Sequence, residues 1–236
     1  MRFLFLLLPA VLCFAHEADL PTQLARVQQL PTEQVRSLQA KLAVDAVHGD
    51  RKAYYELYLD YVLASRQRNE DPKGTKALVD RSLTAHEASR DPETQALVGA
   101  MLGLKIGFSP MSGMTLSPRA MQLFNEALAQ RPTSPRITLL KAIHVLHMPA
   151  FVGGGAKAAL PLMETAVQLS TKEVPSADPW TPTWGRIECL GWLAYTQVEN
   201  DQVAEAQKTA DQVLVLDPGN GFITHMVLPR LQAKGK

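Results

Sequence analysis

PRITLLKAIHVLHMPAFVGGG, which spans residues 135–155, is the stretch on which the fold depends. Its three glycines stand at the mouth of a helix that we expect to begin near Ala156. That helix is followed by PWTPTWG at residues 179–185, a Pro/Trp-rich insert that could fold back beside the glycines. The surrounding sequence has the apolar spacing of ordinary helices, so the unusual chemistry is concentrated here.

Helical periodicity covers most of the rest of the chain. Apolar residues recur at spacings of three and four, and short segments rich in Gly, Asn, Asp and Pro interrupt them as turns. Ser117 is suited to cap a helix that has Pro118 at its first position. The predicted helices cover residues 32–47, 51–66, 73–89 and 93–107, a loop follows over 109–117, and a capping helix covers 221–231.

A repeat is visible in the second half of the chain. Small and apolar residues recur with offsets of four and three, and a proline follows five positions later. The copies are Ala120, Phe124, Ala127 and Pro132, then Ala206, Ala210, Val213 and Pro218, with a fainter copy at Ala158, Leu162 and Thr165. In the tetratricopeptide repeat, small residues stand where paired helices cross and proline ends the second helix, and this sequence resembles that family. We therefore predict an all-α fold, a tetratricopeptide-like superhelical array of about five antiparallel helix pairs.

Two motifs narrow the resemblance. PAFVGGG at 149–155 and PTWG at 182–185 look like a pair found in exported bacterial tetratricopeptide proteins. There, a Pro-x-Phe-x-Gly-Gly-Gly segment joins the two helices of one repeat and Pro-x-Trp-Gly opens the next. This resemblance covers roughly residues 136–229 and implies no particular activity. A more distant likeness is to the T component of TRAP-type transporters, a periplasmic helical-repeat protein implicated in handling small ligands.

Composition places the chain among folded globular proteins. Hydrophobic residues make up 46% of its 236 residues and charged residues 20%, which is unlike a disordered chain. The formal net charge is +1, with both signs mixed along the sequence. Nucleic acid and anionic lipid both require a basic face, so this balance gives no reason to expect either as a partner.

The first fifteen residues are typical of a signal peptide. Arg2 is followed by an apolar run and by Ala15, where cleavage would occur, so we expect a single domain over residues 16–236 in the periplasm or outside the cell. Lipid attachment at Cys13 is the less favoured alternative, because Leu12 occupies a position where a lipoprotein signal has a small residue. No later stretch supplies the roughly 18 uninterrupted apolar residues of a transmembrane helix.

The glycine segment has two interpretations. Gly153, Gly154 and Gly155 could adopt positive φ and present successive N–H groups at a helix start, where an anion or carboxylate would bind and Lys157 would add charge. Alternatively, the glycines only permit a tight turn and let Trp184 lie flat on the backbone. Neither a nucleotide-binding glycine pattern nor a preceding strand is present.

Aromatic residues near this segment are the other candidates for binding. Phe151 and Trp184 could line a pocket, and Trp180 with Trp184 could line a peptide groove. The core is the favoured place for Trp184, whereas exposure and burial remain open for Trp180.

Metal and catalytic sites find little support. His144 and His147 are three residues apart, enough for two ligands on one helix face, but further ligands are missing nearby. His16 would become an amino-terminal copper ligand if cleavage followed Ala15. Cys189 lies in an apolar helix and is expected to be buried and inert. We find no catalytic constellation and expect no cofactor and no metal.

Three functions follow from these features. The first is a non-catalytic scaffold whose concave face binds a protein or peptide. The second is a small-ligand carrier with a pocket between the Gly153–Gly155 loop and Trp184. The third is an enzyme or metalloprotein that uses His144 and His147. The sequence favours the first, and carboxylates within reach of both histidines would be needed to favour the third.

Overall fold

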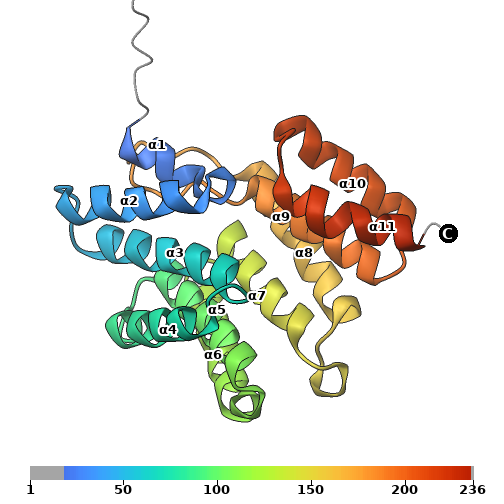
Figure 1. Ribbon diagram of the computed structural model, residues 1–236, viewed down its shortest axis with the longest axis horizontal. Helices are drawn as coiled ribbons and strands as arrows, with labels where there is room; N and C mark the ends of the chain where they lie inside the picture. Colours follow the sequence, from blue (N-terminus) through green and yellow to red (C-terminus); the bar gives the residue numbers. More distant parts are fainter. Residues whose placement is uncertain (1–18, 235–236) are drawn as a thin grey trace, which may run out of the picture.

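Helices are the only regular elements within residues 19–234, the part of the chain that the computed structural model describes (Figure 1). The prediction of an all-α fold is therefore confirmed for these residues. The α-helices are α1 (Leu20–Ala25), α2 (Thr32–Val44), α3 (Asp50–Gln67), α4 (Pro72–His86), α5 (Pro92–Phe108), α6 (Gly113–Gln130), α7 (Pro135–His147), α8 (Ala156–Lys172), α9 (Arg186–Glu199), α10 (Val203–Leu216) and α11 (Leu228–Lys234). Short 3-10 segments are η1 (Val27–Gln29), η2 (Pro110–Ser112) and η3 (Ala150–Val152), and η4 (Ile223–Val227) is a π-helical turn.

Capping residues followed by proline fix the start of three central helices. The side chain of Asp71 accepts a hydrogen bond from the backbone N–H of Gly74 at 2.9 Å, and Asp91 accepts one from Thr94 at 2.9 Å. Ser134 does the same for the N–H of Ile137 at 3.2 Å. Each cap precedes a proline at the first helical position, where its missing N–H costs nothing. The predicted starts of α4 and α5, at residues 73 and 93, are right to within one residue, whereas no start was predicted for α7.

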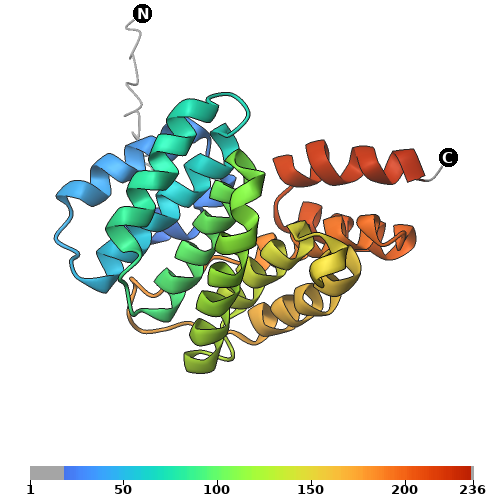
Figure 2. The same ribbon diagram turned by 90° about the horizontal axis from the view of Figure 1, so that it is seen from below.

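The helices pack as consecutive pairs. α3 packs on α4, α5 on α6, α7 on α8 and α9 on α10, and each pair also contacts the next. The first helices of successive pairs, α3, α5, α7 and α9, contact one another along the stack. Figures 1 and 2 show the pairs following one another from the N-terminal side to the C-terminal side, with α1 and α2 before them and α11 after them. The face shared by the first helices is therefore a continuous surface.

The core of each pair depends on small residues in the second helix. Ala120, Phe124 and Ala127 of α6 are fully buried, as are the equivalent residues of α10. A side chain on Gly99 of α5 would come within 2.9 Å of the Phe124 ring, so α5 and α6 approach each other as closely as glycine allows. The repeated offsets of four and three thus mark the buried face in these two helices.

The third copy of the repeat lies one residue later than the sequence suggests. The buried residues of α8 are Ala159, Met163 and Ala166, whereas Thr165 of the predicted copy is exposed. Two adjacent alanines made both registers possible, and a shift of one residue turns a helix by about 100°. A fourth copy with the same offsets, Thr75, Val79 and Ser82, is buried on α4.

Three further features of the helices differ from the prediction. α6 begins at Gly113, so Pro118 lies inside the helix, where its missing N–H leaves only the carbonyl of the exposed Met114 without a helical partner. The capping helix is divided into η4 and α11. α1 and η1 were not predicted, although Leu24 and Val27 in them are fully buried.

Candidate functional site

The face of α7 that runs along the stack has two very different ends. Residues 136, 140, 143 and 147 lie on one side of this helix because they are separated by four, three and four positions. Arg136, at the first end, is buried, and His147, at the other end, is exposed. We call these the closed end and the open end of α7.

Arg136 is held at the closed end by two carboxylates. Its Nε donates to Glu93 Oε2 at 2.9 Å, and its two terminal nitrogens donate to the carboxylate of Glu173 at 3.0 and 2.5 Å. One of them also donates to the carbonyl of Trp184 at 3.0 Å, and Ser134 donates to Glu93 at 2.7 Å. Burial lowers the pKa of Arg136, but Glu93 and Glu173 raise it by more, so this guanidinium remains charged. The network ties α5, α7 and the segment after α8 together.

Trp184 lies over the same end as part of the core. Only 4% of it is exposed, its Nε1 donates to the hydroxyl of Tyr54 at 2.6 Å, and its ring stacks on Tyr58 with centroids 4.6 Å apart. Trp180 is half-buried, edge-on to Tyr55 at 6.0 Å. The segment 173–185, which we call the insert, therefore covers α3 rather than lining a groove, and the core interpretation of Trp184 is confirmed.

Residues 27–30, which we call the N-terminal segment, also cover α3. Arg66 of α3 donates to the backbone carbonyls of Val27, Gln28 and Leu30, at 3.2, 2.8 and 2.6 Å respectively. Gln29 donates to Glu188 at 3.1 Å, and the other oxygen of Glu188 accepts the N–H of Gly185 at 2.9 Å. Burial raises the pKa of Glu188 above its usual value. η1 and the start of α9 thus meet at the closed end.

The glycine turn does not offer an anion site from its own N–H groups. The N–H of Gly153 donates to Ala150, that of Gly154 to Pro149 and that of Gly155 to Val145, at 3.0, 3.1 and 2.9 Å. The predicted anion-binding arrangement is therefore wrong for these three groups, because they close the turn and the end of α7. Lys157 is exposed on the first turn of α8.

Only two of the three glycines have positive φ. Gly153 and Gly155 have φ of 85° and 92°, whereas Gly154 does not. A Cβ on Gly154 would collide with the side chain and carbonyl of Met148. Close approach of the chain to itself, and not the backbone angle, is what requires glycine at this position.

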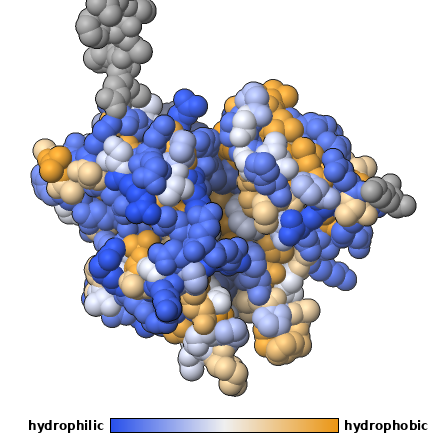
Figure 3. All heavy atoms as spheres, viewed as in Figure 1, coloured by the Kyte–Doolittle hydropathy of each residue, from blue (hydrophilic) through white to orange (hydrophobic). Residues whose placement is uncertain are grey.

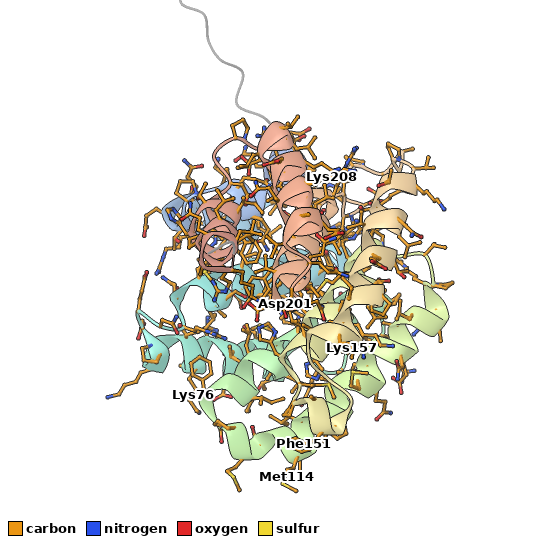
Figure 4. All side chains as sticks on the ribbon, turned by 90° about the vertical axis from the view of Figure 1, so that its right-hand side faces the viewer. Lys76, Met114, Phe151, Lys157, Asp201 and Lys208 are labelled. Carbon is orange, nitrogen blue, oxygen red and sulfur yellow. The ribbon has the colours of Figure 1, made fainter. Side chains whose placement is uncertain are left out.

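Phe151 and Trp184 do not form the expected pocket. Phe151 is 88% exposed beyond the open end of α7, while Trp184 is buried against α3 at the closed end. α8 separates them, since its 17 residues carry the chain about 25 Å back along α7 before the insert begins. Figure 4 shows Phe151 at the edge of the molecule. The expectation that the insert folds back on the glycines is wrong.

The open end of α7 instead meets a group of aromatic rings that the sequence analysis missed. His147 is edge-on to Trp192 at 6.0 Å, Trp192 lies 4.8 Å from Phe222, and Tyr195 lies within 6.0 Å of both Trp192 and Phe222. Arg230 lies 5.1 Å above the Tyr195 ring. We call these four rings and Arg230 the aromatic cluster. The spacing of three between Trp192 and Tyr195 on one helix face was the available signal.

None of these rings is fully buried. Trp192, Tyr195 and Phe222 are half-buried and His147 is exposed. The space-filling view shows the surface hollowed between the N-terminal helices and the C-terminal helices, with hydrophobic residues along the hollow (Figure 3). The uncovered parts of these rings can supply apolar contact area to another molecule.

The two histidines of α7 point to different partners. His144 is buried, its Nε2 lies 3.0 Å from the hydroxyl of Ser117, and burial lowers its pKa to about 4. The Nδ1 of His147 lies 2.8 Å from the carbonyl of Ile143. Within residues 19–234, no group of three or more His, Cys, Asp or Glu side chains is placed to hold a metal ion. His16 and the predicted cleavage site are outside the described residues.

Cys189 is buried in α9, as predicted. Burial raises the pKa of its thiol well above the usual value, and the nearby Glu188 raises it further. A thiolate is therefore strongly disfavoured at this position.

Two pockets lie away from all of these residues. One, of about 260 Å³, is lined by α2, α3 and α4, and there Asp60 accepts hydrogen bonds from Gln39 at 2.7 Å and Ser82 at 2.5 Å. The other, of about 220 Å³, lies between α4, α5 and α6 beside the ion pair of Lys105 and Asp80. Neither includes a residue that the sequence analysis proposed for binding. Among the described helices, none has the length and apolar character needed to cross a membrane.

Comparisons with known proteins support the fold alone. No model of a protein family matches the chain, and no curated protein matches it. Among solved structures, the HusA haemophore from Porphyromonas gingivalis is similar, with a TM-score of 0.57. The likeness covers 76% of this chain and 92% of HusA, at 21% sequence identity. The helical arrangement described above therefore also occurs in a haemophore.

Proposed function

We propose that this protein is an exported, non-catalytic binding protein whose helix pairs are tetratricopeptide-like repeats. The observation that carries the proposal is the aromatic cluster, a set of three half-buried rings and one exposed ring at the open end of the face shared by the first helices. Residues 1–15, with their signal-peptide pattern, support export to the periplasm or the cell exterior.

The repeat interpretation is supported by the buried positions of four second helices. α4, α6, α8 and α10 each bury residues with offsets of four and three, and their pairs follow one another along the chain. Arrays of this kind present the faces of their first helices as an extended binding surface. Here the insert and residues 27–30 cover the closed end of that surface, so a partner has access to the end that contains the aromatic cluster.

A peptide or protein segment is the partner that suits the aromatic cluster best. Half-buried tryptophan and tyrosine rings supply a large contact area with little loss of side-chain freedom, and they dominate the energy of many interfaces. Arg230, which lies above Tyr195 and forms an ion pair with Glu199 at 3.4 Å, adds a donor at the rim. We expect an extended segment with an apolar or aromatic anchor.

Selection from a displayed peptide library, followed by measurement of Kd for the selected peptides, tests this function. Trp192→Ala should weaken binding at least about tenfold, because central aromatic residues commonly contribute 2 kcal/mol or more. Val215→Ser is the matched control, since Val215 is 82% exposed on α10 and lies outside the aromatic cluster. Peptides that bind both variants as tightly as the unchanged protein would place the binding surface elsewhere.

The second candidate function is a carrier of a planar small molecule. HusA is described as a haemophore, and here an exposed histidine lies 6.0 Å from a tryptophan ring, a combination that could hold a flat, metal-containing ligand. Titration with haemin, followed by its absorbance, distinguishes the two functions. A saturable spectral change that His147→Ala abolishes would favour the carrier, and the absence of saturation would exclude haem.

A further inference from the structure

Two neighbouring loops expose large apolar side chains at one end of the molecule. Met111 and Met114, around the start of α6, are each 83% exposed, while Phe151 and Val152, in η3, are 88% and 53% exposed. Figure 4 labels Met114 and Phe151 beside each other at the lower edge, and Figure 1 places both loops at the same end. We call these four residues the apolar tips.

The turns hold the apolar tips outward. Three glycine N–H groups bond to the carbonyls of residues 150, 149 and 145, and Gly154 packs directly on Met148. η2 is closed by the N–H of Gly113, which bonds to the carbonyl of Pro110. With these hydrogen bonds formed, Phe151 lies outside the core, with 88% of its surface exposed. Exposed apolar groups of this kind mark an interaction surface.

Charge near the apolar tips is uneven, although the whole chain is nearly neutral. Between Glu93 and Glu164 the sequence contains a single acidic residue, Glu126. The two helix pairs that carry the apolar tips, α5 with α6 and α7 with α8, therefore have few carboxylates near the tips. Lys157, which lies six residues after Phe151 in the first turn of α8, is exposed. An anionic surface would therefore meet a lysine and little repulsion at this end of the molecule.

The shape of this end favours a bilayer over a protein partner. The space-filling view shows the two tips as separate protrusions with hydrophobic surface at the lower edge (Figure 3). A protein partner requires a broad complementary area, of roughly 800 Å² on each side, whereas short apolar protrusions enter the boundary between headgroups and acyl chains without one.

We propose that the apolar tips are a docking surface for an anionic lipid bilayer. Phe151, Met111 and Met114 enter the interfacial layer, and Lys157 contacts lipid phosphates. The array then stands on the membrane surface with the aromatic cluster still open. This surface is independent of the function proposed above, because it shares no residue with the aromatic cluster.

Sedimentation with vesicles tests the proposal. The full chain, and the same chain without residues 1–15 so that the apolar leader cannot bind lipid, are mixed with vesicles of phosphatidylcholine alone or with about one third phosphatidylglycerol. We expect binding to the anionic vesicles that the double variant F151S/M114S reduces by at least about tenfold, since each inserted side chain loses its transfer from water. Val215→Ser should bind unchanged. Lys157→Gln should bind a few-fold more weakly, and the difference should shrink at high salt.

Three results would overturn the proposal. They are no sedimentation with either kind of vesicle, binding that F151S/M114S leaves unchanged, and equal binding to neutral and anionic vesicles. Light scattering on the same proteins covers a second copy of this chain as the occupant, because a dimer that F151S/M114S dissociates, without vesicle binding, would assign the surface to self-association. Circular dichroism melting of each variant separates loss of binding from loss of fold.

Discussion

The two ends of α7 show how one helix face serves stability at one end and leaves contacts available at the other. At the closed end, Arg136 is 4% exposed and bonds to carboxylates from two other parts of the chain. At the open end, His147 is exposed beside half-buried rings, and Phe151 is 88% exposed. Both ends belong to the same helix in the same stack of helix pairs, so the pairing of helices alone does not explain the difference.

The insert explains it. Trp184 donates a hydrogen bond to Tyr54, which is 130 residues earlier in the chain. Glu173 supplies the second carboxylate that bonds to Arg136. The insert therefore covers the closed end and does not reach the open end. Changes at the closed end should therefore affect folding, and changes at the open end should affect contacts with other molecules.

Among changes at the two ends of α7, Arg136→Met should have the largest effect on stability. The substitution leaves Glu93 buried without its charged partner, and removing one member of a buried ion pair costs about 3–5 kcal/mol. The free energy of unfolding in urea measures the loss.

The double variant E93L/R136M is the control for that measurement. It removes both charges and restores apolar packing, which is often close to neutral for a buried pair. Recovery of most of the loss would show that the unpaired charge was responsible. If the single variant were as stable as the unchanged protein, the closed end would not depend on this network.

Gly154→Ala should have the next largest effect, at the turn that begins beyond the open end. Its new Cβ collides with the backbone of Met148, and forcing such a contact costs about 1–3 kcal/mol. Gly153→Ala is the matched control, because its Cβ would meet open space and its cost would come only from positive φ, about 1–2 kcal/mol. Urea denaturation compares the two, and equal losses would mean that the Met148 contact is not limiting.

Much of the fold follows from local patterns. Apolar periodicity placed the starts of α4 and α5 to within one residue, and the repeated offsets identified the buried faces of α6 and α10. The cap predicted at Ser117 and Pro118 was wrong, because α6 begins earlier, at Gly113. Where local signals were ambiguous, as with the adjacent alanines at 158 and 159, the register was wrong by one residue. η1 was missed because its short segment carries too few apolar residues to show a period.

The candidate site was harder to predict, for a physical reason. Whether an aromatic residue is buried depends on which distant segment covers it, and the contact of Trp184 with Tyr54 spans 130 residues. Phe222 joins Trp192 only because the segment before α11 folds back on α9. Local spacing identified the unusual residues, but it could not show which of them share a surface.

His144, between the two ends of α7, should make stability depend on pH. Its pKa is lowered by burial to about 4 in the folded protein, so the unfolded chain binds more protons between about pH 6.5 and 4. Its contribution is complete above that range and is lost as the pH falls, with a slope of at most about 1.4 kcal/mol per pH unit. Burial raises the pKa of Glu188 and of Asp60, and these groups act with the opposite sign, because stability is lost as the pH rises through a raised pKa.

Urea denaturation at several pH values isolates this contribution. His144→Gln keeps a polar group near the Ser117 hydroxyl but cannot titrate. The difference in unfolding free energy between the unchanged protein and this variant should be constant above about pH 6.5 and should move in favour of the variant as the pH falls. A difference that does not depend on pH would mean that His144 titrates normally in the folded state.

The smallest effect on stability should come from the apolar tips, because their side chains are mostly exposed. Phe151→Ser and Met114→Ser remove large side chains that are 88% and 83% exposed, so the free energy of unfolding should change by less than about 0.5 kcal/mol. Thermal and urea denaturation measure this, with Phe124→Ala as the buried counterpart, for which a loss of about 3–5 kcal/mol is expected. A loss above 1 kcal/mol for Phe151→Ser would mean that its ring packs on the chain in solution. An unchanged stability would mean that the exposed ring of Phe151 does not stabilise the fold. A contact with another molecule would then be the remaining explanation for a phenylalanine at this position.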